Sequence, residues 1–175
     1  MNTGAKFGGI AALVQALCYL FGFAMLATVM NPGSTEGWSQ VQRLEFILER
    51  AALFQAWNIV IYVVFGVALV VLAVVLHRLL APASSLLMAI ATPFGLIWSG
   101  LVIASGMVAN VGLANVAAIY ARDAAEAAST WATIGTVQDG LGGGVEIVGG
   151  LWVLSTKSRL MQTCSFLTGS QSRRP

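Results

Sequence analysis

The stretch from Ile59 to Leu76 is the feature that most restricts how this chain can fold. Its 18 residues contain no charged side chain and no amide side chain, and His77 and Arg78 follow directly. A strand of a water-soluble protein is shorter than this and is bounded by turn residues. A helix of about 20 apolar residues, by contrast, crosses the roughly 30 Å hydrocarbon core of a bilayer. We therefore predict a transmembrane helix over about 54–77.

The composition places the whole chain in the same class. Of its 175 residues, 58% are hydrophobic and only 9% are charged, whereas soluble domains have roughly 25% charged residues. The formal net charge of +2 provides no basic surface for nucleic acid, so no nucleic-acid partner is expected. The apolar content also excludes intrinsic disorder, because disordered chains are poor in apolar residues.

Three further apolar runs are long enough to cross a bilayer. The first covers about 7–30, is too long for the apolar region of a cleaved signal peptide, and ends before a proline and a glycine. The next extends from residue 86 to about 120, which exceeds a bilayer, so we expect a membrane span over 86–109 from which Asn110 to Ser129 emerge as an alanine-rich helix. A break at 110–112 is the alternative. The last run covers 134–154.

The predicted fold is all-α, a polytopic membrane protein with four transmembrane helices in a compact bundle that forms one domain over residues 1–154. Between the first two spans, residues 38–50 place Val41, Leu44 and Leu48 on one helix face, which is typical of an interfacial amphipathic helix. Residues 155–175 are polar and basic, so we expect a flexible tail there.

The distribution of charge predicts the orientation. Four spans place the N-terminus, the His77-Arg78 turn and the tail on one side, with six basic and no acidic residues, and leave three basic and five acidic residues on the other. Basic loops are retained in the cytoplasm during insertion. We therefore expect a multi-pass protein of the bacterial inner (cytoplasmic) membrane, surrounded by the lipid bilayer, with both termini cytoplasmic.

The fourth predicted span contains two acidic residues, Asp139 and Glu146. Seven helical positions turn through about 700°, so the two carboxylates lie within about 20° of each other on one face. Glycines that permit close helix packing accompany them on that face or beside it: Gly135, Gly140, Gly142, Gly144 and Gly149. An acid inside a bilayer is costly and normally faces a partner or a water-filled cavity. We therefore expect Asp139, Glu146 and the glycines beside them to be the functional residues.

Three interpretations of the carboxylates stay open. In the first, they bond to polar side chains of the other spans, namely Gln15, Asn58 and Ser99, and fix the packing of the bundle. In the second, they relay protons or cations through a transporter or channel. In the third, the segment from Gly135 to Gly150 is partly unwound and forms a ligand loop, because so many glycines weaken a helix.

Enzymatic chemistry is not expected from this sequence. The single histidine, His77, sits at the end of a predicted span, where a cation at a helix C-terminus is favourable. The two cysteines, Cys18 and Cys164, are far apart in the chain and predict neither a disulfide framework nor a metal site. We expect no cofactor, no metal and no catalytic residue.

Three motifs carry a resemblance: Gln138-Asp-Gly-Leu-Gly-Gly-Gly-Val-Glu146, Pro93-Phe-Gly-Leu-Ile-Trp98 and Ile103-Ala-Ser-Gly106. In these residues the chain resembles a family of bacterial multi-span inner-membrane proteins to which no activity is assigned. Those related chains continue as apolar helix beyond the position of Leu154, whereas a polar tail follows here. The resemblance therefore implies a shortened bundle that needs a partner.

The resulting functional expectation is a non-enzymatic membrane protein whose acidic, glycine-rich fourth helix serves helix packing or assembly. The expected partner is a second copy of the chain or another membrane protein. The alternative is a small proton- or cation-coupled transporter or channel-like protein that uses Asp139 and Glu146.

Overall fold

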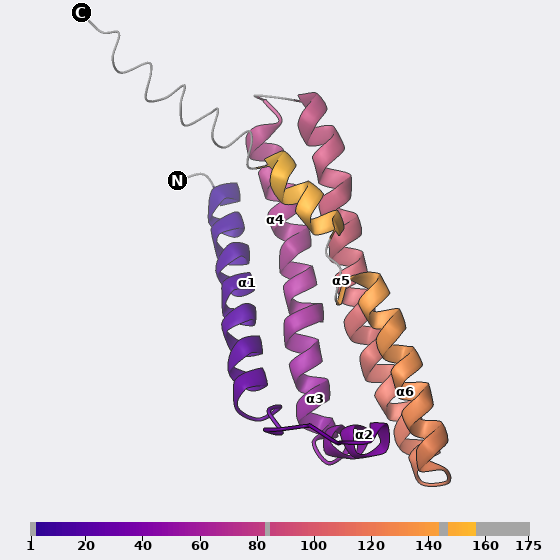
Figure 1. Cartoon of the computed structure of the whole chain (residues 1–175). Helices are drawn as coiled ribbons and strands as arrows, with labels where there is room; N and C mark the ends of the chain where they lie inside the picture. The colour runs from indigo at the N-terminus through magenta and orange to yellow at the C-terminus, as the bar shows by residue number, and fades with distance from the viewer. Residues whose placement is uncertain (1–2, 83–84, 144–146, 157–175) are drawn as a thin grey trace, which may run out of the picture.

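The computed structural model describes residues 3–82, 85–143 and 147–156, and all regular structure in them is helical. The elements are α1 (Thr3–Ala27), α2 (Gln40–Leu48), α3 (Ala51–Asn58), the π-helical turn η1 (Ile59–Val64), α4 (Phe65–Leu80), α5 (Ser85–Tyr120), α6 (Ala124–Gln138) and the π-helical turn η2 (Asp139–Gly143). Residues 147–156 are also helical. Figure 1 shows the long helices side by side, with the short α2 across one end of the bundle.

Three helices are long and apolar enough to cross a membrane: Gly4–Ala27, Ala51–Leu80 and Ser85–Tyr120. The second combines α3, η1 and α4 in one continuous helix. These helices correspond to the first three predicted spans and pack together. The prediction of an all-α, multi-pass membrane protein is confirmed to that extent.

The third helix differs from the prediction in its second half. α5 continues without a break through Asn110, so the alternative break at 110–112 is wrong. The alanine-rich helix expected to continue from Asn110 to Ser129 ends at Tyr120, and a new helix, α6, begins at Ala124. The neighbouring helix contacts Asn110. Asn110 Nδ2 donates to the Gln55 carbonyl (3.2 Å), and Gln55 Nε2 donates to the Asn110 carbonyl (3.5 Å). The side-chain N–H of Asn110 is thus bonded across the α3–α5 contact, and α5 continues past it.

The chain reverses after Tyr120, and α6 begins at a capped N-terminus. The carboxylate of Asp123 accepts hydrogen bonds from the backbone N–H groups of Ala125 (2.8 Å) and Glu126 (2.9 Å). Such a cap satisfies donors that the first turn of a helix leaves without partners. It separates α5 from α6 at a point where composition alone suggests one continuing helix.

The predicted fourth span, 134–154, is not one unbroken helix. α6 begins earlier, at Ala124, and leads into η2, where Gly142 has φ +130°. That backbone conformation is easily reached only by glycine. Helical structure is described again from residue 147 and extends to Thr156, past the predicted end. Glu146 and Gly144 lie outside the described residues, as does the remainder of the predicted tail, 157–175.

The amphipathic helix expected over 38–50 is confirmed as α2. Ser39 caps it through a capping box with Gln42. Leu44 is fully buried and packs with Val116 of α5 and Ala127 and Ala128 of α6, and Val41 and Leu48 lie at the edge of this cluster. The apolar stripe therefore fastens α2 to the α5–α6 end of the bundle.

Packing among the long helices follows their order in the chain. α1 packs on η1 and α4, α4 packs on α5, and α5 packs on α6 and η2. α1 and α6 form no contact of comparable extent in the described part of the chain. The side between these two helices is therefore left open, and both described cavities that bear on function lie there.

Candidate functional site

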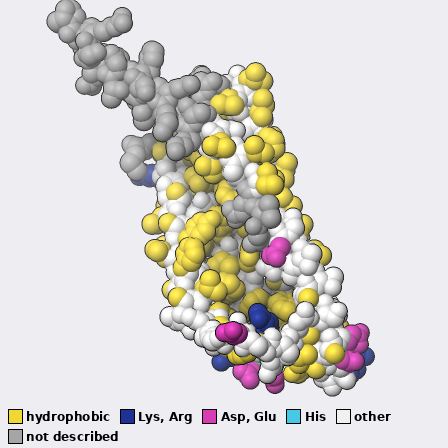
Figure 2. All heavy atoms as spheres, in the orientation of Figure 1, with side chains coloured by type: hydrophobic (Ala, Val, Ile, Leu, Met, Phe, Trp, Pro, Cys, Tyr) yellow, Lys and Arg dark blue, Asp and Glu magenta, His cyan; other side chains and the backbone are white. Residues whose placement is uncertain are grey.

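A groove between α1 and α6 consists of two adjoining cavities. The inner cavity, about 320 Å³, lies at mid-length of the bundle, and the end cavity, about 460 Å³, lies beside α2. Leu26 of α1 and Trp57 of α3 line both cavities. Figure 2 shows this side of the molecule, with a hollow among hydrophobic atoms above an end where the acidic side chains gather.

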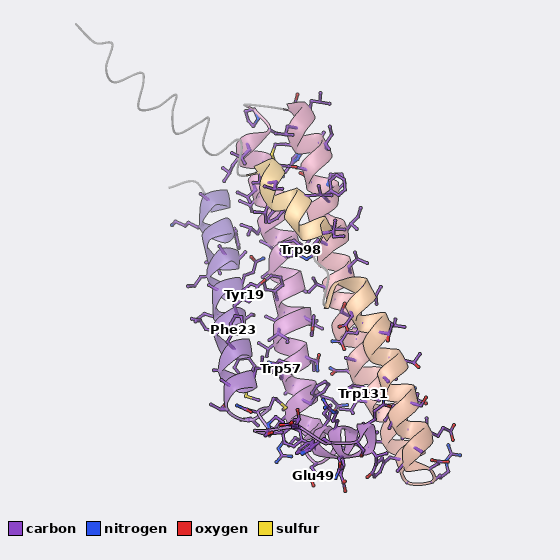
Figure 3. The ribbon with its side chains drawn as sticks, viewed as in Figure 1. Tyr19, Phe23, Glu49, Trp57, Trp98 and Trp131 are labelled. Carbon is purple, nitrogen blue, oxygen red and sulfur yellow. The ribbon has the colours of Figure 1, made fainter. Side chains whose placement is uncertain are left out.

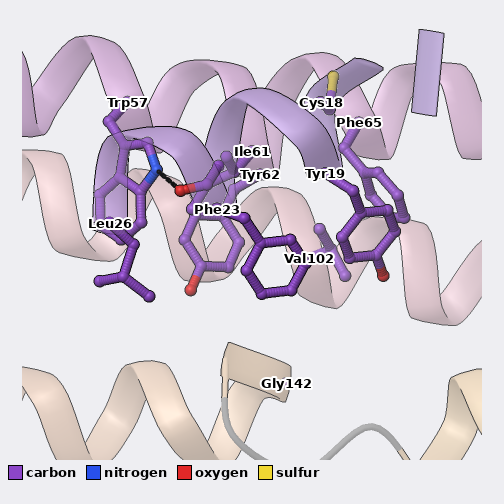
Figure 4. A pocket seen from close by; sticks show the side chains of 11 residues that line it. Cys18, Tyr19, Phe23, Leu26, Trp57, Ile61, Tyr62, Phe65, Val102 and Gly142 are labelled. Atoms are coloured by element: carbon purple, nitrogen blue, oxygen red, sulfur yellow. Dashed lines mark hydrogen bonds between the residues drawn. The ribbon is translucent and has the colours of Figure 1, made fainter. Parts of the chain in front are cut away.

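The inner cavity is lined mainly by aromatic side chains. Tyr19 and Phe23 come from α1 and Tyr62 from η1, and Gly142 of η2 lies on the opposite wall. Figure 4 shows these side chains pointing into the space in front of Gly142. The indole Nε1 of Trp57 donates to the Gly22 carbonyl at 3.3 Å. The indole therefore presents its rings to the cavity while its polar atom is satisfied.

The end cavity is also rich in aromatic rings and has one charged lining residue, Arg43 of α2. Phe54 stacks edge-on against both Trp57 and Trp131, with ring centroids 5.8 Å apart in each pair. Trp131 brings α6 to this cluster (Figure 3). Edge-to-face pairs of this kind are favourable beyond the area that they bury, so this wall of the groove is a rigid aromatic surface.

Asp139 is exposed at the start of η2. It follows Ala128 by eleven residues, so its direction differs by about 20° from that of Ala128 at 100° per residue. Ala128, Trp131 and Ala132 line the end cavity. Asp139 therefore lies on the α6 face that borders the groove. Its preceding carbonyl, that of Gln138, accepts a hydrogen bond from Ser105 Oγ at 3.3 Å, which places Asp139 near the middle of α5.

The three polar residues predicted to meet the carboxylates have other contacts. Asn58 is fully buried and donates through Nδ2 to the Phe54 carbonyl (3.0 Å). Ser99 is fully buried and donates to the Gly95 carbonyl (2.7 Å). Gln15 Nε2 is buried without a hydrogen-bond partner among the described residues. The described hydrogen bonds do not bring any of the three to Asp139.

The predicted packing glycines differ in their surroundings. A Cβ added to Gly149 would lie 2.5 Å from Trp98, and one added to Gly95 would lie 2.6 Å from Trp152. The two tryptophans therefore sit reciprocally on glycines of facing helices, with their ring centroids 5.9 Å apart. A Cβ at Gly135 or Gly140 would meet no described atom within 4 Å. Gly142 has its positive φ, which disfavours any other residue there.

The described residues contain no group of three or more His, Cys, Asp and Glu side chains that could hold a metal ion. His77 is a link between helices, because its Nδ1 lies 2.8 Å from Thr92 Oγ1 of α5. The groove has an apolar, aromatic surface with one cation, Arg43, at its end, and the Asp139 carboxylate lies beside it without lining either cavity. Such a surface is suited to binding.

The groove residues carry no pattern in the sequence that predicts them as a site. Their aromatic side chains are spread over α1, α2, α3, η1 and α6, so only the packing of these helices brings them together. One local signal existed for the start of α6: Asp123-Ala-Ala-Glu126 has the spacing of a helix N-cap box. This motif indicates that a new helix begins at residue 124, and Trp131 belongs to that helix.

No family model matches this sequence, and comparisons with curated proteins and with solved structures gave no significant match. Function is therefore argued from the geometry of the chain itself.

Proposed function

We propose that the chain is a non-enzymatic, multi-pass membrane protein that acts by assembling with another transmembrane helix through α6. The observation that carries this proposal is the outer face of α6. It is exposed, and it is made of small residues: Ala125, Ser129, Thr133, Thr136 and Gly140. Within a bilayer, small residues are what allows two helices to approach closely, whereas a face that meets only lipid has no need of them.

The polar atoms of this face are compatible with close helix contact. Thr133 Oγ1 donates to the Ser129 carbonyl, and Thr136 Oγ1 donates to the Ala132 carbonyl, both at 3.1 Å. The hydroxyl groups are thus satisfied within α6, and a partner helix need only fit their shape. Hydroxyls with such local bonds can also bond across an interface.

Asp139 lies on the groove side of α6, about 40° from Ala125 at the edge of the outer face, and supports the same function. An ionised acid at the centre of a membrane helix costs about 2.5–3.5 kcal/mol on insertion scales. Among the described residues, the ion pair that is formed joins Arg50 and Glu49 and does not involve Asp139. A partner that buries or hydrogen-bonds the carboxylate would remove this cost, so assembly is favoured where Asp139 is covered.

The proposal includes a fourth membrane crossing, made of two helical pieces. α6 and residues 147–156 follow α5 in the opposite direction: Ile134 contacts Gly112, Gln138 bonds to Ser105, and Trp152 contacts Gly95. From Gly112 to Gly95 this course covers about 25 Å of α5, close to the thickness of the hydrocarbon core. A broken fourth span places both chain ends on one side of the membrane.

Charge then orients this arrangement in the bacterial inner membrane. Lys6 and Arg78 lie at the end of the bundle where α1 begins and α4 ends, and the described acidic residues of the loops and of α2 lie at the other end. The basic end is proposed to be cytoplasmic, in accordance with the positive-inside rule.

The alternative, a proton or cation relay through Asp139 and Glu146, has less support. Asp139 borders the groove but is not among the residues that line either cavity. A relay needs its acids to face a water-filled path, and the groove walls are predominantly aromatic and aliphatic.

Cysteine cross-linking in native membranes tests the assembly proposal. In a background with Cys18→Ala and Cys164→Ala, Thr136→Cys should form a disulfide-linked product, because it lies on the proposed interface. Leu20→Cys is the matched control, since Leu20 is exposed on the outer side of α1. The mass of the product tells a second copy from another protein. Equal yields at the two positions would contradict the proposal.

A second pair of variants tests the close approach. Gly140→Leu adds a bulky side chain to the proposed interface and should abolish the Thr136→Cys product. Gly100→Leu makes the same change at an exposed glycine of α5 that also has open space around it, and should leave the product intact.

Proton flux separates assembly from the relay. Asp139→Asn keeps the shape of the side chain and its ability to hydrogen-bond, but it no longer titrates. Purified protein in liposomes should show no proton flux above that of empty liposomes. A flux that is present in the unmodified protein and lost in Asp139→Asn would replace assembly by the relay.

A further inference from the structure

We propose that the groove between α1 and α6 binds an anionic phospholipid, with its phosphate at Arg43 and one acyl chain along the aromatic walls. The site is separate from the outer face of α6 proposed for assembly. It uses the side of α6 that carries Ala128, Trp131 and Ala132, and it is open between the helices, so a lipid can enter sideways from the bilayer.

The charge of the groove determines the kind of head group. Arg43 is the charged residue among the side chains that line the two cavities. Its Nη2 donates to the Thr35 carbonyl at 3.3 Å, and no ion pair of Arg43 occurs within the described part of the chain. A guanidinium has five N–H donors in a planar fork that suits phosphate oxygens. Arg43 can therefore bind a phosphate group at the end of the groove next to α2.

The length of the groove fits one leaflet. Along α6 and η2 it extends from Ala128 beside α2 to Gly142 at mid-length. Fourteen residues of helix span about 21 Å, which is close to half of the 40–45 Å thickness of a bilayer with its head groups. A phospholipid held at Arg43 would thus extend its acyl chain to the position of Gly142, near the bilayer midplane.

The surface of the groove is suited to an acyl chain. Phe23, Tyr62 and Val102 project into the inner cavity (Figure 4). Apolar surface that is covered by a well-fitting chain gains many dispersion contacts. In this region the floor is the α3–η1–α4 helix with Val102 of α5, and the walls are α1 and η2, so the chain would lie between two elements that make no extensive contact in the described part of the chain.

The test is lipid retention from vesicles of defined composition. The full-length protein is reconstituted in vesicles of equal parts phosphatidylglycerol and phosphatidylcholine with identical acyl chains, extracted in a mild detergent, and analysed for lipid per protein by mass spectrometry. The unmodified protein should retain phosphatidylglycerol in preference to phosphatidylcholine. Equal retention of the two lipids would overturn the proposal.

Two variants locate the bound lipid. Arg43→Gln should reduce the preference for phosphatidylglycerol about fivefold, the equivalent of about 1 kcal/mol for one basic residue near an anionic lipid. Arg122→Gln is its control, because Arg122 is exposed in the α5–α6 turn at the same end and lines neither cavity. If the two substitutions have equal effects, the site is not at Arg43.

A second pair tests the path of the acyl chain. Ala132 is exposed and lines the end cavity, so Ala132→Trp should fill the groove without overpacking the core and should lower the retention of both lipids. Ala118→Trp places the same side chain at an exposed position of α5 outside the cavities. Far-UV circular dichroism and thermal unfolding verify that all variants fold. Retention by folded Ala132→Trp that equals that of Ala118→Trp would overturn the proposal.

Discussion

Gly149→Ala tests whether residues 147–156 pack on α5 as the structure has them. An added Cβ would lie 2.5 Å from Trp98 Cε2 and 2.8 Å from Cδ2 and Cζ2, distances that real Cβ atoms do not show. The indole has little freedom to move away, because Phe65 and Trp152 contact it with ring centroids at 6.1 and 5.9 Å. Gly150→Ala is a matched control, since a Cβ at Gly150 would meet no described atom within 4 Å.

The expected magnitude follows from two opposing effects. Alanine favours a helix over glycine by up to about 1 kcal/mol, and this gain is common to both substitutions. Overpacking a well-filled contact costs typically about 1–3 kcal/mol, and this cost falls on Gly149→Ala alone. The difference between the two variants therefore isolates the packing effect, and Gly149→Ala should be less stable than Gly150→Ala by about 1–3 kcal/mol.

The assay is reversible unfolding in mixed micelles with increasing denaturing detergent, followed by far-UV circular dichroism. The transition of Gly149→Ala should move to lower detergent, whereas that of Gly150→Ala should stay or rise. In a Trp98→Phe background, where the ring is smaller, the difference should fall by half or more, because the clash is with the indole. Equal stabilities of the two alanine variants, or a difference that is independent of Trp98, would refute the packing described here.

Three further predictions concern the other contacts. Leu44→Ala, which empties a fully buried position, should destabilise the protein by about 2–5 kcal/mol in thermal unfolding, whereas Leu53→Ala at an exposed position should have little effect. Asp123→Ala removes the cap of α6 and should lower the stability of the protein by about 1 kcal/mol. Hydrogen exchange should show faster exchange of the backbone amides in the first turn of α6. Gln55→Ala and Asn110→Ala should each destabilise by about 1 kcal/mol, and the double variant should lose about the sum, because each side chain donates to a backbone carbonyl that the other substitution leaves in place.

The sequence predicted the elements whose pattern is local. Eighteen apolar residues from Ile59 require a membrane or a buried helix wherever the rest of the chain goes. The stripe of Val41, Leu44 and Leu48 predicted both the helix α2 and its buried face, because apolar residues three or four positions apart lie on one face of a helix. In both cases the information lies within a few turns of helix.

Features that depend on contacts with residues of other helices could not be predicted from the sequence. The alternative break at 110–112 is one example, because the side-chain N–H of Asn110 bonds to the carbonyl of Gln55 on another helix and α5 continues. The groove is a further example, since Tyr62 of the inner cavity and Arg43 of the end cavity belong to one groove only through the packing of several helices. The glycine content did predict, in the third interpretation, a partly unwound stretch between Gly135 and Gly150, and the helix is interrupted there at Gly142; the ligand loop of that interpretation stays a prediction.

The order of helix packing has a consequence for how the molecule is made. Because α1 rests on α4, α4 on α5, and α5 on α6, each long helix that leaves the ribosome finds its main neighbour already inserted. Contacts between near neighbours in sequence form early and with a small loss of chain entropy. The amphipathic α2 is the exception, because Leu44 is covered only after Ala127 and Ala128 of α6 arrive. Its docking therefore waits until α6 has been synthesised, and of the packing described here only that of residues 147–156 on α5 follows it.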